Sequence, residues 1–293
     1  MSTLAQSIYK TLAFFDAQDF PLTLPEIRNY LVKEPSGLAG NSLSEIKNAL
    51  DTDLPNLAAC KMGLYFLAGR EELVQGRRAN YRISLKRFIK IRRYLYPLRY
   101  FPYLRAVAVS GSQALSHGEQ ASDIDLFIII SKGRIWLARG LVSLYFQILG
   151  QRRYGKNISD RFCLNHYVCE GHELVEDRNL YTAVEYSSLI PVLGCEQLEE
   201  FWRGNGWIRD FLHDPQFQKQ NQFFKFEFSA ARKVFEAVLD FTIAPFLNWL
   251  FGLYQKRRIK RQEYILVSDR ELSFHPGSRG QQVLAKFSAK IGG

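Results

Sequence analysis

The stretch that decides the fold is residues 107–130, which read VAVSGSQALSHGEQASDIDLFIII. Both ends are short apolar runs rich in β-branched residues, a pattern typical of buried strands. Gly111-Ser112 closes the first run, and Asp123 and Asp125 lead into the second. Because side chains alternate along a strand, the two carboxylates project from the same side. The stretch therefore predicts two core strands that bring paired carboxylates close to a glycine-serine turn.

This pattern suits a metal-bound triphosphate. Two carboxylates held together repel each other unless a cation lies between them, and hard oxygen ligands favour Mg²⁺ or Mn²⁺ together with substrate phosphates. Gly111 lets the backbone approach a phosphate closely, and Ser112 adds a hydroxyl at the start of an expected helix. We therefore expect Asp123 and Asp125 to bind metal, and Gly111 and Ser112 to bind nucleotide phosphate. The plain alternative is that both aspartates are solvated residues at the entry to a strand.

The same residues resemble a known family signature. Gly111-Ser112, nine residues, and then Ser122-Asp123-Ile124-Asp125-Leu126 is similar to the pattern of the DNA polymerase beta-type nucleotidyltransferase superfamily, above all its minimal bacterial members. The resemblance covers about residues 104–190. It implies an α+β core, a small mixed sheet with flanking helices, that binds a nucleoside triphosphate and Mg²⁺. It also implies that Asp123 and Asp125 are catalytic.

Two departures from the family pattern bear on activity. Minimal members carry Arg-Gly where this chain has Leu115-Ser116. The family's third carboxylate lies on the next core strand, expected here at residues 161–169 (RFCLNHYVC), whose centre offers Asn165. An amide oxygen ligates a hard cation, but it carries no charge and cannot accept the proton of an attacking hydroxyl. Asp160 and Glu185 are the candidates to replace the missing acid.

Positive charge is concentrated just before this core. The chain carries a formal net charge of +10, and residues 77–105 hold ten basic residues, no acidic one and several tyrosines. A basic segment with interleaved aromatics is typical of contact with nucleic acid or polyphosphate. The alternative is a solvated helix face whose apolar residues pack inward. The residues expected to contact a polyanion are Arg87, Lys90, Arg92 and Arg93.

The N-terminal residues 1–84 have the element order of a winged helix. We expect a helix from Leu4 to Phe15, two short helices opened by the capping boxes Thr23/Glu26 and Ser42/Glu45, and a ribbon pairing residues 65–69 with 81–83 across a turn at 75–76. The third helix presents a mixed set of outward residues that suits DNA poorly, so a protein partner is favoured: Glu45, Lys47, Asn48 and Asp51.

The remaining segments complete a three-part organisation. A basic connector at 85–103 leads into a core at 104–193, followed by a helical C-terminal domain at 194–293. Within the core we expect helices at 133–150 and 179–193. The first carries Arg134 and Arg139, which are candidates for phosphate or base contacts, with a plain exposed arginine as the alternative for each. The C-terminal part is expected to hold helices at 195–213 and 226–255, then a loop through 274–277 and a closing helix at 281–287.

The last long helix raises the question of membrane contact. Residues 241–254 are strongly apolar and precede a basic cluster: Lys256, Arg257, Arg258, Lys260 and Arg261. The run is shorter than the roughly 20 residues that span a bilayer, and Pro245 is expected to kink it. We therefore expect a core helix, with peripheral attachment of 241–261 to anionic lipid left open.

Composition limits the other classes of site. The N-terminal residues lack the basic and apolar regions of a signal peptide, which predicts a cytoplasmic protein. The four cysteines have no zinc-ligand spacing, so free thiols are expected. The sequence favours a metal-dependent nucleotidyltransferase that moves a nucleoside monophosphate to an unidentified acceptor. A degenerate core that senses nucleotide or binds nucleic acid is the alternative.

Overall fold

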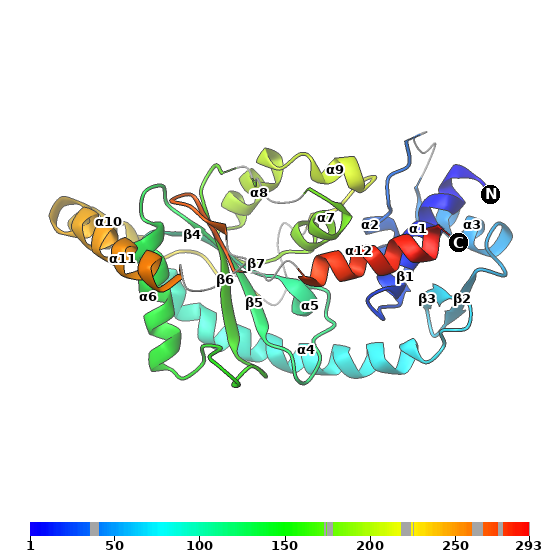
Figure 1. The fold of residues 1–293 in the computed structure, drawn as a ribbon, viewed down its shortest axis with the longest axis horizontal. Helices are drawn as coiled ribbons and strands as arrows, with labels where there is room; N and C mark the ends of the chain where they lie inside the picture. The colour runs from blue at the N-terminus through cyan, green and yellow to red at the C-terminus, as the bar shows by residue number, and fades with distance from the viewer. Residues whose placement is uncertain are drawn as a thin grey trace.

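The computed structural model of the protein describes residues 1–35, 41–172, 174, 178–217, 224, 226–259, 266–274 and 278–292. It is a mixed α+β structure with a small three-stranded sheet near the N-terminus and a larger six-stranded sheet at its centre. Figure 1 shows the N-terminal helices at one end of an elongated molecule, the larger sheet in the middle and a helical hairpin at the other end.

The N-terminal unit contains the three predicted helices: α1 (Thr3–Asp16), α2 (Leu24–Asn29) and α3 (Leu43–Thr52). Both predicted capping boxes form, because the Thr23 and Ser42 hydroxyls accept N–H bonds from Glu26 and Glu45, whose carboxylates bond back. The small sheet has the order β1 (Leu22–Thr23), β3 (Leu64–Leu67), β2 (Ala58–Lys61).

The ribbon in this unit differs from the prediction. Residues 81–83, expected as a strand, and the expected turn at 75–76 both lie inside the long helix α4 (Leu73–Leu95). The partner of β3 is instead β2, which precedes it across a two-residue turn at Met62 and Gly63, both with positive φ. Two central residues of positive φ make the turn type that matches the twist of a hairpin. That turn was missed because methionine rarely adopts this conformation.

The larger sheet has the order β7 (Ile190–Leu193), β4 (Leu104–Val109), β5 (Ile124–Ile130), β6 (Phe162–Cys169), β9 (Glu271–Ser273), β8 (Leu266–Val267). Among the described strands only β5 and β6 pair in parallel. The helix α6 (Ile135–Ile148) makes the crossover between them, as a parallel pair requires. The predicted strands and crossover helix of the core are therefore present.

The predicted helix at 179–193 is wrong in its last part. α7 (Leu180–Ser187) ends early, and β7 follows as an edge strand antiparallel to β4. Pro191 lies within β7, which is compatible with an edge strand because one side of such a strand needs no ladder donor. Gly194 then turns the chain with φ +69, and a Cβ there would lie 1.9 Å from the Arg105 carbonyl oxygen.

Helices cover both faces of the sheet. On one face Ala106, Phe127 and Val168 pack into a cluster that includes α7 and α8 (Cys195–Gly204) and extends from Ala5 to Val283. This cluster joins the N-terminal unit to α12 (Ser278–Ile291), so it crosses the expected domain boundaries. On the other face β5 packs against α4, α6 and the 3₁₀ helix η1 (Tyr96–Tyr100).

The C-terminal part is less regular than predicted. The segment 195–213 holds α8 and the short α9 (Ile208–Phe211), and the segment 226–255 is divided into α10 (Ala230–Thr242) and α11 (Ala244–Ile259), which meet at 82°. Pro245 explains the break, because it lacks an N–H and its ring clashes with the carbonyl four residues earlier. The closing helix is confirmed but longer, while residues 275–277 of the expected loop and Lys260 and Arg261 of the basic cluster lie outside the described residues.

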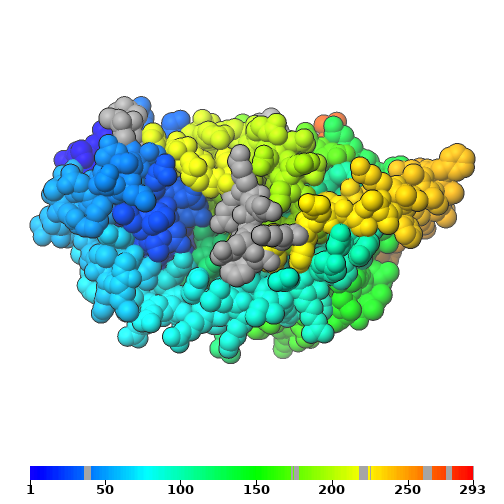
Figure 2. All heavy atoms as spheres, turned by 180° about the vertical axis from the view of Figure 1, so that it is seen from behind, coloured from blue at the N-terminus to red at the C-terminus, as the bar shows by residue number. Residues whose placement is uncertain are grey.

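No single helix in the described part of the chain is long and apolar enough to cross a membrane; α10 and α11 pass that test only together, as a bent pair. They form a hairpin that projects from one end of the molecule (Figures 1 and 2). The expectation of a core helix is wrong for this segment, since Phe241 is 92% exposed and Trp249 58% exposed.

Candidate functional site

The glycine-serine turn lies directly after β4, at the short helix α5 (Gly111–Ala114). Gly111 adopts φ +63, and a Cβ at this position would lie 2.7 Å from Oδ2 of Asp125. A side chain is therefore excluded on two grounds, the backbone conformation and the closeness of the carboxylate. The sequence-predicted turn and strand meet as expected, and the turn backbone lies against one of the two aspartates.

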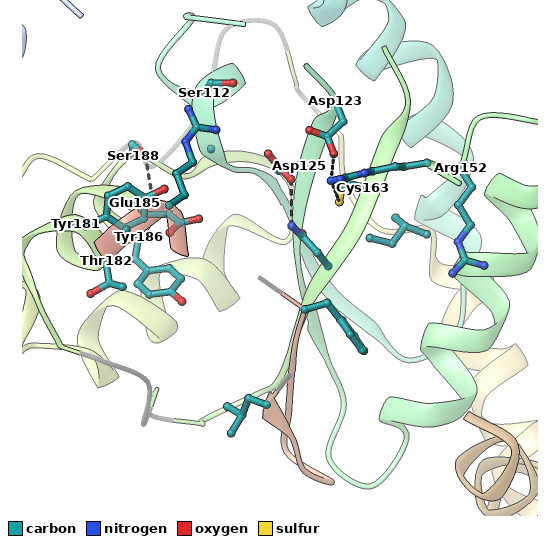
Figure 3. Close-up of a pocket in the computed structure, with 18 of the residues that line it drawn as sticks. Ser112, Asp123, Asp125, Arg152, Cys163, Tyr181, Thr182, Glu185, Tyr186 and Ser188 are labelled. Carbon is teal, nitrogen blue, oxygen red and sulfur yellow. Dashed lines mark hydrogen bonds and ion pairs between the residues drawn. The ribbon is translucent and has the colours of Figure 1, made fainter. Parts of the chain in front are cut away.

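These residues line a large cavity of about 1620 Å³, part of which is drawn in Figure 3. Its walls come from the start of β5 and β6, from α5, α6, α7 and α11, and from the N-terminal unit. The predicted site residues that line it are Gly111, Ser112, Asp123, Asp125, Arg139, Asn165 and Glu185. The structure therefore brings together the predicted metal and nucleotide residues in one cavity, with the exception of Arg134.

Asp123 and Asp125 converge as the strand alternation predicted. One ligand atom of each, together with Sγ of Cys163, lies within 4.8 Å of the others. Asp125 lies between Asp123 on one side and Glu185 on the other (Figure 3). Burial, then repulsion from Asp123 and Glu185, raises the pKa of Asp125 to about 7. A divalent cation would remove this repulsion, so the acids fit a hard cation such as Mg²⁺.

The thiol of Cys163 does not suit the same ion. Burial and the two aspartates raise the pKa of Cys163, so the sulfur stays protonated. A neutral thiol is a poor ligand for a hard cation, whereas carboxylate oxygens are good ones. The donor set therefore consists of the two aspartates, with Glu185 close by.

Two nitrogen donors contact the aspartates. Nη1 of Arg153 lies 2.6 Å from Oδ2 of Asp123, and Nδ2 of Asn165 donates to Oδ1 of Asp125 at 3.1 Å. The Arg153 side chain is 44% exposed, so it can move into solvent without leaving a buried charge. Asn165 presents its amide nitrogen to Asp125 here, and ligation of a cation would require the amide to rotate and present its oxygen. Asn165 thus lies where the sequence placed it.

The two candidates for the third acid differ sharply. Asp160 precedes β6 and is held by Arg87 Nε at 2.9 Å and by Lys90 Nζ at 3.1 Å, so its charge is already neutralised. Glu185, on α7, lines the cavity and acts electrostatically on Asp125. Of the two candidates, Glu185 is therefore the one that lies at the cavity with Asp123 and Asp125.

Arg139 lies deeper in the same cavity, on α6. Its guanidinium carbon is 4.5 Å from the centre of the Phe274 ring, and it donates to Gln255 of α11. Burial lowers the pKa of Arg139, opposed by Tyr167, and Arg152 and Arg258 lower it further. The cavity thus has a basic region formed by Arg139, Arg152 and Arg258, which suits an anionic group. Arg134 is not part of it, since it pairs with Asp240 at 2.9 Å.

The basic segment 77–105 is in large part structural. Arg87 is buried and donates to Asp160 and to four oxygens of the loop before β5, at Glu119 O, Gln120 O, Ser122 O and Ser122 Oγ. The interpretation of Arg87 as a polyanion contact is therefore corrected: its guanidinium holds the loop that carries Asp123. Lys90 is engaged by Asp160, whereas Arg92 and Arg93 are exposed.

Arg77 holds the other end of that loop. It donates to the carbonyls of Leu115 and Ser116 and pairs with Glu26 of α2 at 2.7 Å. Arg77 and Arg87 together fix the segment between the glycine-serine turn and Asp123 against α4. Two of the basic residues that suggested a polyanion-binding surface thus hold a loop of the cavity wall in place.

Sequence reasoning missed Cys163, Arg152 and Arg153. Cys163 lies two positions before Asn165 on the predicted strand, so alternation places both on the same face. Arg152 and Arg153 follow the crossover helix and return to the start of β6, where Arg152 forms a bridge with Phe162. Because a crossover helix returns the chain to the starting edge of the next parallel strand, these arginines were predictable neighbours of Asp123.

Comparison of the chain with protein-family models, with curated proteins and with solved structures finds no match.

Proposed function

We propose that this protein is a metal-dependent nucleotidyltransferase, which transfers a nucleoside monophosphate from a nucleoside triphosphate to an acceptor hydroxyl. The observation that carries the proposal is the convergence of Asp123 and Asp125, with Glu185 beside them, against the backbone of Gly111. Asp160 is held by Arg87 and Lys90, whereas Asp123 lines the cavity and pairs with Arg153, whose side chain is 44% exposed. Acids that repel each other at the wall of a cavity are typical of a site for a divalent cation and a phosphate substrate.

The fold supports the same proposal. The order β4, α5, β5, α6, β6 and α7, with β5 and β6 parallel, agrees with what the resemblance to polymerase beta-type nucleotidyltransferases implies for the core. The N-terminal order α1, β1, α2, α3, β2, β3 agrees with a winged-helix-like module. On α3 the Lys47 charge is neutralised by Asp51, and Glu45 keeps its negative charge while it accepts from Ser42, which favours a protein partner over DNA for this module.

In this mechanism Asp123 and Asp125 would hold Mg²⁺, which when bound would neutralise charge on the reacting phosphate oxygens. The hydroxyl and backbone N–H of Ser112 would hold the β- and γ-phosphates. Gly111 has no Cβ, so the phosphates can approach the turn beside the aspartates. The acceptor oxygen bonds to the α-phosphorus while the bond from that phosphorus to the bridging oxygen breaks, and pyrophosphate leaves. Glu185 accepts the acceptor's proton.

Arg139, Arg152 and Arg258 form the basic end of the same cavity. Their charge favours an anionic part of a substrate, either the departing pyrophosphate or a phosphate on the acceptor. In this proposal the three arginines bind and orient that anionic group, and Glu185 alone accepts the proton.

The first experiment tests transfer directly. The wild-type protein is incubated with each of the four α-³²P-labelled nucleoside triphosphates, with Mg²⁺ or Mn²⁺, and with RNA, cell protein or small-molecule extract as acceptor. We expect label to move with the wild type and with Asp51→Ala, which removes an exposed acid of α3. The Asp123→Ala/Asp125→Ala variant should transfer none.

A second function is supported by one observation. Asn165 replaces an acid on β6, and Arg153 pairs with Asp123, so the site has features of one that binds nucleotide without turning it over. Glu185→Gln separates the two proposals. A loss of transfer with retained nucleotide binding in calorimetry supports the enzyme, whereas metal-dependent nucleotide binding by a wild type that transfers no label supports the sensor.

A further inference from the structure

The helical hairpin formed by α10 and α11 has its apolar side turned outward. Along α10 the exposed apolar residues recur at helical spacing, and along α11 they do the same. The exposed set comprises Val234, Phe235, Val238, Phe241, Ile243, Phe246, Trp249, Leu250, Leu253 and Tyr254. Residues three and four apart lie on one side of a helix, so each helix presents one continuous apolar stripe to solvent. A helix that only covers a core has the opposite arrangement.

The polar side of α10 faces the protein. Oε1 of Glu236 accepts from the backbone N–H of Tyr103 at 2.6 Å and pairs with Arg105 at 3.0 Å. Asp240 accepts from the Tyr103 hydroxyl at 3.0 Å and pairs with Arg134. The helix is therefore attached to the sheet by charged and polar bonds, which fixes the orientation that leaves its apolar stripe outside.

The side of α11 that faces the protein is mixed, because Leu247, Phe251 and Ile259 pack against the core beside two polar residues. Oδ1 of Asn248 accepts from the backbone N–H of Leu137, and Nε2 of Gln255 donates to the carbonyl of Trp136. Gly252 allows α11 to lie close to the Trp136 ring, 3.2 Å from where a Cβ would be. Polar bonds thus attach both helices to the body, and α11 adds apolar packing on its inner side.

The exposed charge of the hairpin is mainly positive. Residues 230–259, which the structure describes throughout, contain just two acids, Glu236 and Asp240; both are paired with arginines, Glu236 is largely buried and Asp240 is 45% exposed. The basic residues Lys233, Arg257 and Arg258 are exposed. They lie at the ends of the helices away from the bend, whereas the most exposed aromatic residue, Phe241, lies next to the bend.

We propose that the α10–α11 hairpin is a docking element for the surface of an anionic membrane. Its apolar apex with aromatic residues would enter the boundary between headgroups and acyl chains, and its basic arms would lie at the level of acidic headgroups. The apex is convex and projects beyond the body (Figure 2). A fluid lipid interface can surround such an apex, whereas a folded partner would need a groove of matching shape.

The same helix reaches the cavity. Phe251, Gln255 and Ile259 of α11 line the space that holds Asp123 and Asp125. Docking through the outer stripe of α11 would therefore place the basic end of the cavity toward the membrane. The docking inference does not depend on the proposed reaction, because no acid of the site takes part in it.

Vesicle flotation of the full-length protein tests the inference. Vesicles of phosphatidylcholine are compared with vesicles of phosphatidylcholine and phosphatidylglycerol in equal amounts. We expect flotation with the anionic vesicles, weakened by high salt, and little with the neutral ones. Phe241→Asp/Trp249→Asp should abolish it. Lys233→Glu/Arg257→Glu should lower the affinity about fivefold or more for each charge.

Matched controls keep the result specific. Ile89→Asp introduces an acid at a 74% exposed apolar residue of α4 and should leave flotation unchanged. Asp123→Asn/Asp125→Asn should also float like the wild type, which separates docking from the proposed catalysis. Absence of flotation with anionic vesicles at low salt overturns the proposal. A dimer that Phe241→Asp/Trp249→Asp dissociates, without vesicle binding, assigns the surface to a second copy of the chain and overturns it equally.

Discussion

Asp125 and Asp160 lie at the starts of two neighbouring parallel strands, yet their surroundings are opposite. Asp160 is bonded by Arg87 and Lys90, and these hydrogen bonds lower its pKa although burial alone would raise it. Asp125 faces Asp123 and Glu185, and burial together with these acids raises its pKa to about 7. One acid has cations that fix a loop, and the other has like charges around a cavity. The contrast separates an acid that stabilises the fold from one that is held among like charges at a cost in stability.

The largest expected effect is a reversal of sign between two matched variants. Asp160→Asn should destabilise the protein by about 2 kcal/mol, because it weakens the pairing of the buried Arg87. Asp125→Asn should stabilise the metal-free protein by about 1–2 kcal/mol, because it removes a desolvated charge that two acids repel. Denaturant unfolding in the presence of a chelator measures both.

Asparagine is chosen at position 160 because Asp160 has φ 60, a conformation that asparagine tolerates, so the substitution adds no backbone strain. The exposure of Asp160 and the remaining acceptors of Arg87 limit the loss. Equal losses of stability in the two variants would contradict the distinction between a structural and a functional acid. Addition of Mg²⁺ should stabilise the wild type and leave Asp125→Asn less affected.

Local chemistry made part of this structure predictable. The capping boxes at Thr23 and Ser42, the strands around 107–130 and the convergence of Asp123 with Asp125 follow from spacing within short segments. Each depends on bonds between residues a few positions apart or on strand alternation. The sequence therefore predicted the acids and the turn that form one wall of the cavity.

Long-range pairing was not predictable from the same signals. Ile190–Leu193 lies in an apolar segment that suits a helix as well as a strand, and only pairing with β4 decides its state. The role of Arg87 depends on Asp160 and on loop carbonyls far along the chain. The outward apolar stripe of α10 depends on Glu236 binding to Tyr103 and Arg105. No local pattern in the sequence contains these partners.

A second pair of variants tests whether the closeness of Gly111 to the Asp125 carboxylate excludes a side chain at position 111. Gly111→Ala places a methyl group 2.7 Å from Oδ2 of Asp125 at φ +63, whereas Gly63→Ala has a similar φ of +76 and open space. The unfavourable φ costs each variant about 1 kcal/mol. Gly111→Ala should lose about 1 kcal/mol more, and its affinity for Mg²⁺ should fall at least tenfold.

Thermal unfolding and calorimetric titration with Mg²⁺ measure these differences. If Gly111→Ala and Gly63→Ala are equally stable and Gly111→Ala binds Mg²⁺ as the wild type does, then the closeness of the turn to Asp125 has no functional consequence. Retained Mg²⁺ binding in Gly63→Ala shows that a general loss of stability is not the cause.

The smallest effect concerns His117. Burial raises the pKa of the acid Asp125, and the same burial should lower the pKa of a base such as His117. Its ring lies 4.8 Å from that of Phe20 and contacts Asn80. Burial, then Arg77 and Arg279, lowers its pKa to about 4, against the opposing effect of Asp19. Between the ordinary pKa near 6.5 and this value the unfolded chain binds more protons than the folded one.

The contribution of His117 to stability is therefore fully present above about pH 6.5 and decreases as the pH falls toward 4. The decrease should amount to about 1–2 kcal/mol across this window. Denaturant unfolding of the wild type and of His117→Gln at several pH values isolates it, because the contributions of the carboxylates are common to both. A constant difference between the two proteins across the window would mean that His117 titrates normally, and that the contact with Phe20 does not keep its ring dry. A difference that shrinks on acidification would show that the loop between the glycine-serine turn and Asp123 is closed against the N-terminal unit, so the cavity wall depends on that unit as well as on the sheet.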